Sequence, residues 1–414
     1  MERDISRVVI TGLGAVTPIG NDVAEFWEGL RQGRNGIGAV TLCDPEGLPV
    51  RIAGEVKDFD PERYLDRKIA RRTGRFAQLA TAAAQQALVD SGLPVDGQAG
   101  DDVGVVMATS GDVFNMGEPW ETLKTRGGLR VDPLIITRHG QHMGAARVAR
   151  ELRLRGPNTT INTACASGTD ALGHALNMLR MGQARALLAG GAEAIVTQLA
   201  LASMGRMGAL SRNNDDPEHA SRPFDRGRDG FVLGEGAGVV MLEREHEARE
   251  RGARIYAELA GVGWSFDATD DAAPDAEGEA LAMRRALRDA DVDADEVDYI
   301  NAHGTSTPLN DKTETVTIKM VLGEEQARRV PLSSTKSMTG HLAAGAGGIE
   351  AVAAVLAMQH GCIPPTINYV TPDPECDLDV VPNESRTADL RVVMSNSFGL
   401  GGQNASAVFR RYEE

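Results

Sequence analysis

Short apolar runs alternate with amphipathic stretches along the first part of the chain. The apolar runs are too short for helices, whereas the stretches between them repeat apolar positions at helical spacing. We expect strands at residues 7–12, 103–109, 159–161 and 186–191, and helices at residues 22–32, 73–90, 139–152 and 168–182. Regular alternation of this kind predicts a parallel sheet with helices on both faces.

The same alternation returns in the second part, with strands expected at residues 255–263, 297–302, 330–335, 390–395 and 405–409 and helices at 278–289 and 347–358. The helices that follow Cys165 and His341 share length, apolar rhythm and a terminal glycine, which indicates an internal duplication. We predict an α/β fold of two halves, residues 1–250 and 251–414. Between them lies the charged segment 243–253, which is more typical of a solvated helix than of a flexible tether.

Two segments depart from this regular pattern. Residues 111–134 show no sustained period and predict an excursion outside the core. Gly12 and Gly14 match only part of a dinucleotide-binding fingerprint, so we interpret them as a tight turn after the first strand.

Charge and cysteine content limit the classes of partner. A formal net charge of −16 at pH 7 argues against nucleic acid or an anionic membrane as the main partner. The basic residues within 67–75 predict either a docking site for an acidic protein or, more commonly, a solvated helix face. The four cysteines lack disulfide or zinc spacing, and no apolar run reaches membrane-spanning length. We expect a soluble cytoplasmic protein without a signal peptide.

Cys165 stands where a β-branched strand ends and a helical pattern begins. Backbone N–H groups and the positive end of the helix dipole meet at such a corner, so we expect a lowered pKa for the Cys165 thiol. The small side chains at residues 164–168 would let a substrate carbonyl approach the sulfur. A buried structural cysteine is the alternative interpretation.

Two histidines lie in loops rich in Gly, Ser and Thr. His303 directly follows the strand expected at 297–302, and His341 comes shortly after the strand expected at 330–335. Residues at the carboxyl ends of strands line a common crevice in doubly wound sheets, so we expect both imidazoles to meet Cys165. A single histidine is more often a core residue, but two in such loops favour a catalytic site.

Six motifs together resemble the elongating β-ketoacyl-acyl carrier protein synthases over nearly the whole chain. They are T-A-C-A-S-G at 163–168, R-P-F-D at 222–225, D-G-F-V-L-G-E-G at 229–236, H-G-T-S-T-P at 303–308, K-S-M-T-G-H at 336–341, and N-S-F-G followed by two further glycines at 396–402. The resemblance implies a thiolase-like fold with a layered α-β-α-β-α arrangement. It also implies decarboxylative Claisen condensation by a homodimer, or by a heterodimer with a chain-length-factor-like subunit.

The resemblance further implies roles for individual residues. Cys165 would accept an acyl chain from the phosphopantetheine of an acyl carrier protein. Its backbone N–H and that of Leu400 would hold the thioester oxyanion, with Phe398 beside them in the same glycine-rich loop. His303 and His341 would donate N–H groups to the enolate oxygen that forms when malonyl-carrier protein loses carbon dioxide.

Supporting roles follow from the same resemblance. Lys336 would complete the catalytic set, and Glu350 and Asp311 would stand with it behind the histidines, although a buried structural ion pair would look the same. Thr305 and Thr307 would bind the pantetheine arm. The resemblance implies no metal and no redox cofactor.

Three departures from the family pattern concern substrate choice. Leu400 stands where the family has a gating phenylalanine, Gln403 stands where it has threonine, and D-D-A at residues 270–272 replaces His-Met-Thr. We therefore expect a specialised ketosynthase of polyketide or polyene synthesis, with housekeeping fatty acid elongation as the alternative. A degradative thiolase would need a second cysteine within residues 396–404, and a non-catalytic chain-length partner would lack Cys165.

Overall fold

Ten strands form two five-stranded sheets that are joined at one edge. The computed structural model describes residues 6–270 and 273–413 of the chain. In spatial order, the first sheet contains β1 (Val8–Val16), β7 (Gly236–Arg244), β6 (Ala186–Glu193), β4 (Val103–Ala108) and β5 (Asn158–Ile161). The second contains β8 (Ala257–Phe266), β14 (Gln403–Arg411), β13 (Val392–Phe398), β9 (Tyr299–Asn301) and β10 (Leu332–Ser333). β1 joins β8 through Val9 and Ile10.

The two sheets repeat one topology, which agrees with the predicted internal duplication. In each half the first strand pairs antiparallel with the last, the last pairs antiparallel with its next neighbour, and the two outer pairings are parallel. Equivalent helices connect equivalent strands, α3 (Arg75–Ser91) matching α10 (Ala276–Ala290) and α7 (Ser167–Arg180) matching α14 (Ala346–His360). The predicted α/β fold of two duplicated halves is therefore confirmed.

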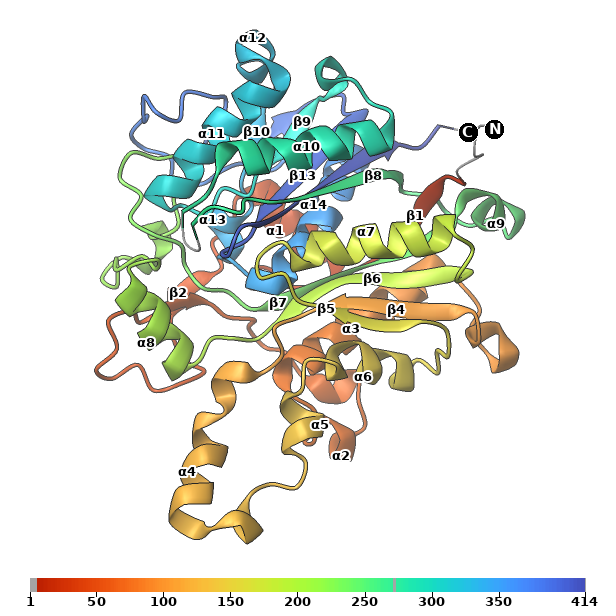
Figure 1. Cartoon of the computed structure of the whole chain (residues 1–414), viewed down its shortest axis with the longest axis vertical. Helices are drawn as coiled ribbons and strands as arrows, with labels where there is room; N and C mark the ends of the chain where they lie inside the picture. The colour runs from red at the N-terminus through yellow and green to blue at the C-terminus, as the bar shows by residue number, and fades with distance from the viewer. Residues whose placement is uncertain (1–5, 271–272, 414) are drawn as a thin grey trace.

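Helices and sheets stack in five layers (Figure 1). α7 and α14 lie between the sheets, α3 and α6 (Met143–Glu151) cover the outer face of the first sheet, and α10 and α11 (Pro308–Leu322) cover that of the second. Residues 346–358 of α14 are buried all round, as expected for a helix between two layers. A Cβ added at Gly168 would stand 2.7 Å from the amide nitrogen of Gly348, so the central helices touch through glycine.

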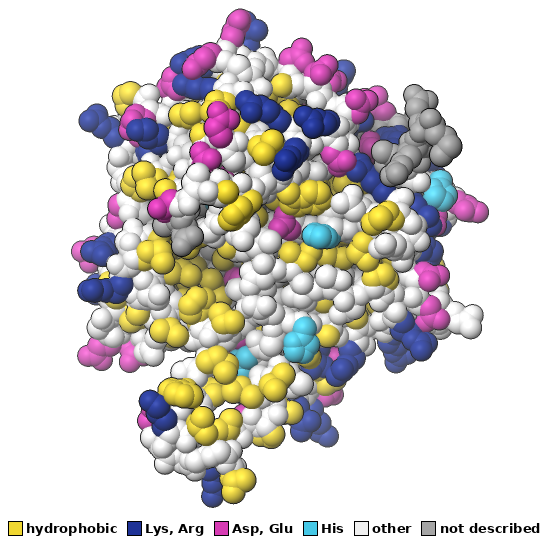
Figure 2. Space-filling model, in the orientation of Figure 1, with side chains coloured by type: hydrophobic (Ala, Val, Ile, Leu, Met, Phe, Trp, Pro, Cys, Tyr) yellow, Lys and Arg dark blue, Asp and Glu magenta, His cyan; other side chains and the backbone are white. Residues whose placement is uncertain are grey.

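Residues 113–139, here termed the arm, extend away from the layers (Figure 1). The arm contains α4 (Gly117–Arg126) and α5 (Ile135–His139), and its surface carries hydrophobic side chains (Figure 2). The prediction of an excursion at residues 111–134 is confirmed, because no side chain between Val113 and His139 is buried. The predicted solvated helix within 243–253 is present as α9 (Glu245–Glu250).

The remaining elements are short and lie around the layers. They are α1 (Val23–Gln32), β2 (Ile37–Ala39), β3 (Ile52–Gly54), α2 (Arg67–Ala70), α8 (Gln198–Met207), α12 (Glu324–Ala327), α13 (Lys336–Thr339), β11 (Cys362–Ile363) and β12 (Arg386–Thr387). Among the described residues, no helix combines the length and the hydropathy needed to cross a bilayer.

The prediction of a wholly parallel sheet was wrong. β7, which the sequence pattern did not predict as a strand, lies antiparallel to both β1 and β6 in the middle of the first sheet. β14 takes the corresponding place in the second sheet. Each half thus ends with a strand that returns antiparallel through its own sheet, β14 after the short loop 399–402 and β7 after a longer connection that contains α8.

The predicted turn at Gly12 and Gly14 was also wrong, because both glycines lie inside β1. A Cβ at Gly12 would stand 2.1 Å from the carbonyl oxygen of Ala87, and a Cβ at Gly14 would stand 1.9 Å from that of Ala83. Both carbonyls belong to α3. The glycines therefore let α3 pack directly on the strand backbone.

Candidate active site

Cys165 occupies a strained corner between β5 and α7. The preceding residue, Ala164, has a φ of +51°, a left-handed conformation that L-residues rarely adopt. Ser167 stabilises the corner, since its hydroxyl accepts a hydrogen bond from Thr163 N at 2.7 Å and donates one to Ala164 O at 2.6 Å. This backbone geometry holds the partly buried Cys165 side chain in the wall of a cavity.

The structure brings His303 and His341 to the same cavity. His341 Nε2 lies 3.0 Å from Cys165 Sγ. The two imidazole rings are 5.4 Å apart and almost perpendicular, at 85°. His303 follows β9, and His341 follows the short helix α13. Cys165 and the two histidines, which are 138 and 176 residues distant from it in sequence, therefore form one cluster.

Other motifs of the sequence hold His341 in place. Its backbone N donates to Val232 O at 2.7 Å, and its carbonyl accepts from Gly234 N at 2.9 Å. The Phe231 ring packs edge-on against the imidazole at 5.3 Å. The segment 229–236 is thus a support for His341 rather than a separate site.

Glu314 holds the other histidine and was not identified from the sequence. Its carboxylate accepts hydrogen bonds from His303 N at 2.8 Å and from Gly304 N at 2.7 Å. Burial raises the pKa of Glu314 to about 7, and these two backbone hydrogen bonds oppose the rise. One sequence feature could have identified Glu314: it is an acidic residue one helical turn after Asp311, on the buried face of α11.

Asp311 supports the loop rather than an imidazole. Its carboxylate accepts from Phe224 N at 2.7 Å and from Ser306 N at 3.1 Å, and it lies 3.6 Å from Arg228. The expected location behind the histidines is therefore only partly correct, because Asp311 fixes the backbone at Phe224 and Ser306 and makes no hydrogen bond to either ring among the described contacts.

Lys336 and Glu350 form a buried ion pair that joins α13 to α14. Burial lowers the pKa of His303 and His341 well below the ordinary value of 6.5, and the positive charge of Lys336 lowers both further. The two imidazoles are therefore neutral at physiological pH. A neutral imidazole carries one N–H donor and one bare nitrogen, so each ring can donate to an oxygen or accept a proton.

The expected fall in the pKa of Cys165 was wrong in direction. Burial raises the pKa of this thiol, and a hydrogen bond from the Leu400 backbone N–H and the charge of Lys336 offset only part of the rise. The start of α7 does lie next to the sulfur, as the sequence predicted. Desolvation disfavours the charged form and is the largest effect on this pKa, so the resting group is a thiol.

The cavity around the cluster has a volume of about 440 Å³. Thr305 and Thr307 line it, and their hydroxyls lie 3.1 Å apart. Phe398 packs against His303 at 5.8 Å between ring centres, whereas the Leu400 side chain is 53% exposed at the rim. The cavity thus contains the proposed oxyanion loop and both threonines. Of the departing residues 270–272, Asp271 and Ala272 lie outside the described residues.

The Cys-His-His cluster also offers the donor atoms of a zinc site. Among the described residues, Cys165 Sγ and one nitrogen of each histidine lie within 4.8 Å of one another. Lys336, however, acts on both imidazoles as a neighbouring positive charge. A second cation in this position would be repelled, so the cluster suits covalent and hydrogen-bond catalysis better than metal binding.

The basic run at residues 67–75 divides into two parts. Arg75 lies inward and forms an ion pair with the buried Glu235 at 2.6 Å, where it lines a second cavity between the arm and the sheets. The other four, Arg67, Lys68, Arg71 and Arg72, are exposed. Only this second part provides a solvated surface.

Neutral histidines lead to a testable pH dependence. Since the pKa of both rings is lowered, neither should gain a proton as pH falls from 8 to 6, whereas an ordinary histidine of pKa about 6.5 would be mostly charged at pH 6. NMR of imidazole-labelled protein should show that the signals of His303 and His341 do not shift across this range. Assignment through His303→Ala and His341→Ala identifies them, and a signal of either ring that titrates near 6.5 would contradict the expectation.

Comparison with known proteins gives a consistent result. Residues 6–248 match the family described as beta-ketoacyl synthase, N-terminal domain, and residues 256–370 match its C-terminal domain. A curated relative from Synechocystis sp., named 3-oxoacyl-[acyl-carrier-protein] synthase 2, is 47% identical over 98% of both chains.

Solved structures agree with the sequence comparison. The ishigamide ketosynthase/chain length factor matches with a TM-score of 0.92 and 39% identity, covering 99% of this chain and 100% of that one. A type II polyketide synthase ketosynthase, solved in complex with its acyl-carrier protein, matches with a TM-score of 0.89 and 36% identity over the same shares.

Proposed function

The chain belongs to the β-ketoacyl synthase family, and on this premise we propose that Cys165 is the nucleophile of its condensation reaction, with His303 and His341 as hydrogen-bond donors to the enolate. The protein is an acyltransferase of the ketosynthase class, and enzymes of this kind act on carrier-bound substrates without a further cofactor. The observation that carries the proposal is the 3.0 Å contact between His341 Nε2 and Cys165 Sγ, inside a cavity that also holds His303.

The first half-reaction loads the acyl chain. Because the resting group is a thiol, Cys165 must lose its proton as sulfur attacks the incoming thioester carbonyl. His341 in its neutral form takes that proton at Nε2 and returns it to the departing pantetheine sulfur. The Leu400 N–H, which already points at the sulfur, and the Cys165 N–H stabilise the oxyanion between the two steps.

The second half-reaction forms the new carbon–carbon bond. Malonyl-carrier protein loses its carboxylate as carbon dioxide, and the released electron pair becomes an enolate on the thioester oxygen. His303 donates its N–H to this oxygen, and His341 donates as the neutral tautomer that carries its proton on Nε2, the nitrogen that is bare during loading, in a site where burial keeps both rings neutral. The enolate carbon attacks the acyl group on Cys165, the sulfur leaves as thiolate, and one proton restores the thiol.

Two measurements test this function directly. Intact-mass analysis after incubation with acyl-carrier proteins detects loading of Cys165, and release of carbon dioxide from malonyl-carrier protein detects the second half-reaction. Release of carbon dioxide separates the alternatives, because neither a degradative thiolase nor a non-catalytic chain-length partner would decarboxylate malonyl-carrier protein. Absence of both from the folded protein would refute the proposal.

The pathway is proposed from the substrate-facing residues. The name of the Synechocystis relative favours fatty acid elongation, whereas the ishigamide and type II polyketide neighbours favour polyketide synthesis. Leu400 in the cavity lining and Gln403, between the cavity-lining residues Gly402 and Asn404, depart from the elongation pattern, so we favour polyketide or polyene synthesis. A panel of saturated and polyene acyl-carrier proteins, compared by loading rate, decides between the two.

Leu400 provides the first substrate-selective prediction. Overpacking a fitted site costs about 1–3 kcal/mol, and about 1.36 kcal/mol corresponds to a tenfold change in rate. Leu400→Phe should therefore slow loading of long or rigid acyl chains by roughly ten- to hundredfold, and short chains far less. Loading rates of a short and a long acyl-carrier protein are compared on both variants.

A matched control separates volume from location. Leu309 also lines the cavity and is 61% exposed, so Leu309→Phe adds the same volume away from the glycine-rich loop. A uniform change across chain lengths in Leu400→Phe would show that this position does not select substrate.

The arm supports a proposed second subunit. Trp120 is 57%, Leu129 102% and Ile136 70% exposed, and β5 ends the first sheet with its outer edge unpaired among the described strands. We propose that this face packs against a copy of the chain or a chain-length-factor-like subunit. The native mass of the purified protein distinguishes the two, since only a self-dimer forms from one chain.

Three further expectations remain predictions. An acyl carrier protein is proposed as the partner that delivers both substrates, by similarity to the neighbour solved with its carrier. A boundary between residues 250 and 251, at the end of α9, is proposed for the two halves. A cytoplasmic location is proposed from the cysteines, all of which are free.

A further inference from the structure

A buried carboxyl group with no role in the mechanism above lies in the wall of the catalytic cavity. Glu279, in the first turn of α10, is fully buried and lines the cavity together with Asp267 and Asn404. Its Oε2 accepts a hydrogen bond from Thr317 Oγ1 at 2.7 Å. Its Oε1 has no hydrogen-bond partner among the described residues. A buried polar atom without a partner is unfavourable, so this oxygen is suited to a ligand.

The surroundings favour the uncharged form of Glu279. Burial raises its pKa well above the ordinary value of 4.5, and the nearby carboxyl groups of Glu314, Asp267 and Asp275 raise it further, while the Thr317 hydrogen bond opposes the rise. A neutral carboxyl group has one O–H donor and one C=O acceptor. Its unpartnered side can therefore exchange hydrogen bonds with an uncharged polar group such as an amide.

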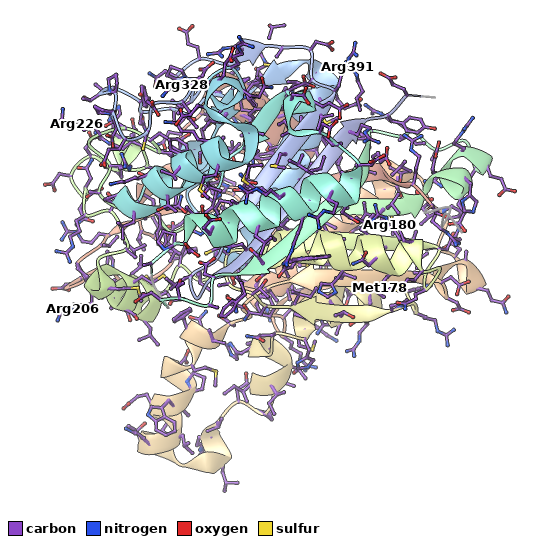
Figure 3. All side chains as sticks on the ribbon, turned by 45° about the horizontal axis from the view of Figure 1, so that its top comes forward. Met178, Arg180, Arg206, Arg226, Arg328 and Arg391 are labelled. Atoms are coloured by element: carbon purple, nitrogen blue, oxygen red, sulfur yellow. The ribbon has the colours of Figure 1, made fainter. Side chains whose placement is uncertain are left out.

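Hydrogen bonds hold the cavity wall beside Glu279, and an ion pair holds the far end of its helix. Asp267, which follows β8 and lines the cavity with Glu279, accepts from Asn404 Nδ2 at 2.5 Å, and its backbone N donates to Gly402 O at 2.9 Å, which ties the cavity wall to the glycine-rich loop. At the last turn of α10, Asp289 pairs with Arg180 of α7 at 2.9 Å; Figure 3 labels Arg180. The carboxyl group is thus held in place before any substrate binds.

The ligand that must cross this cavity is the phosphopantetheine arm. Its thioester has to reach Cys165, while the carrier protein stays outside, so the phosphopantetheine lies along the cavity walls between the two. Phosphopantetheine contains two amide groups, each with one donor and one acceptor. We propose that Glu279 forms a hydrogen bond with an amide of the phosphopantetheine and thereby positions carrier-bound substrates. This inference rests on the proposed function, and it adds to the cavity a polar contact separate from Thr305 and Thr307.

The test compares two acyl donors, one with and one without the pantetheine group. Octanoyl-coenzyme A carries this group without a carrier protein, whereas the S-ethyl thioester of octanoic acid lacks it. Loading of Cys165 is followed by intact mass. Glu279→Leu should slow loading from octanoyl-coenzyme A by about tenfold, equal to about 1.4 kcal/mol, and leave loading from the S-ethyl thioester unchanged.

Two further variants separate a hydrogen bond to substrate from a structural effect. Glu279→Gln keeps a neutral donor and acceptor, so it should restore loading from octanoyl-coenzyme A to within about threefold of the parental rate. Thr317→Val removes the hydrogen bond on the α11 side only and should load both donors at the parental rate. Should Glu279→Leu fail to fold, Glu279→Met, which is closer in volume, takes its place.

The outcomes are distinct. Equal slowing of both donors by Glu279→Leu, or no slowing of either, would overturn the role of Glu279. Failure of the parental protein to load Cys165 from any donor would instead count against the proposed function. Slowing of octanoyl-coenzyme A alone, with rescue by Glu279→Gln, supports the hydrogen bond.

Discussion

Cys165→Ala is expected to abolish acyl loading from every acyl-carrier protein while the protein remains folded. Cys165 is the sole thiol that lines the catalytic cavity among the described residues, and its sulfur contacts both His341 and the Leu400 N–H. Alanine fills the corner without a nucleophile, and removing one partly buried sulfur leaves the surrounding hydrogen bonds of Ser167 intact. Intact mass measures loading, and circular dichroism confirms the fold.

The other cysteines provide the control for this experiment. Cys43, Cys362 and Cys376 lie outside the catalytic cavity, so replacing them by alanine should leave loading unchanged. An acyl adduct on any of these three in the parental protein would contradict the assignment.

Cys165→Gln, which resembles an acylated cysteine in shape, is expected to retain decarboxylation of malonyl-carrier protein without condensation. A Cys165→Gln variant that is inactive in both assays would contradict the separation of the two half-reactions.

Loss of either histidine is the second large effect expected. His303→Ala and His341→Ala each remove one donor to the enolate oxygen, and loss of one such donor typically lowers the rate by roughly 10²- to 10³-fold. Loading should persist in both, at a reduced rate in His341→Ala because that ring contacts the sulfur at 3.0 Å. Carbon dioxide release and formation of the β-keto product are measured separately from loading.

A histidine outside the site makes the comparison specific. His246 lies exposed on α9, so His246→Ala should condense at the parental rate. If His303→Ala or His341→Ala also condensed at the parental rate, that histidine would be a structural residue of the core. Complete loss of loading in His303→Ala would show instead that this ring acts in the first half-reaction.

The alternation of strands and helices was readable from local pattern alone. Apolar runs such as residues 103–109 and 186–191 became β4 and β6, and the amphipathic stretches became α3 and α7, because burial of one face is encoded residue by residue. The duplication was also visible, since equivalent helices carry equivalent apolar rhythm.

Strand direction and glycine packing needed the assembled fold. Whether a buried strand runs parallel or antiparallel depends on the path of the connection before it, and this path leaves no periodic signal in β7 or β14. Gly12 and Gly14 carry the residue type of a turn, yet they serve contact with α3, a partner more than 60 residues away.

The sequence by itself determined which residue types meet at the site, because Cys165, His303 and His341 each lie in a motif that follows an expected strand. Their charge states were decided by the tertiary structure. Burial raises the pKa of Cys165 against the local helix dipole, and burial together with Lys336 keeps both imidazoles neutral. Glu314 and Glu279 became recognisable only when α10 and α11 were placed beside the cavity. Desolvation depends on everything packed around a group, and most of those neighbours are distant in sequence.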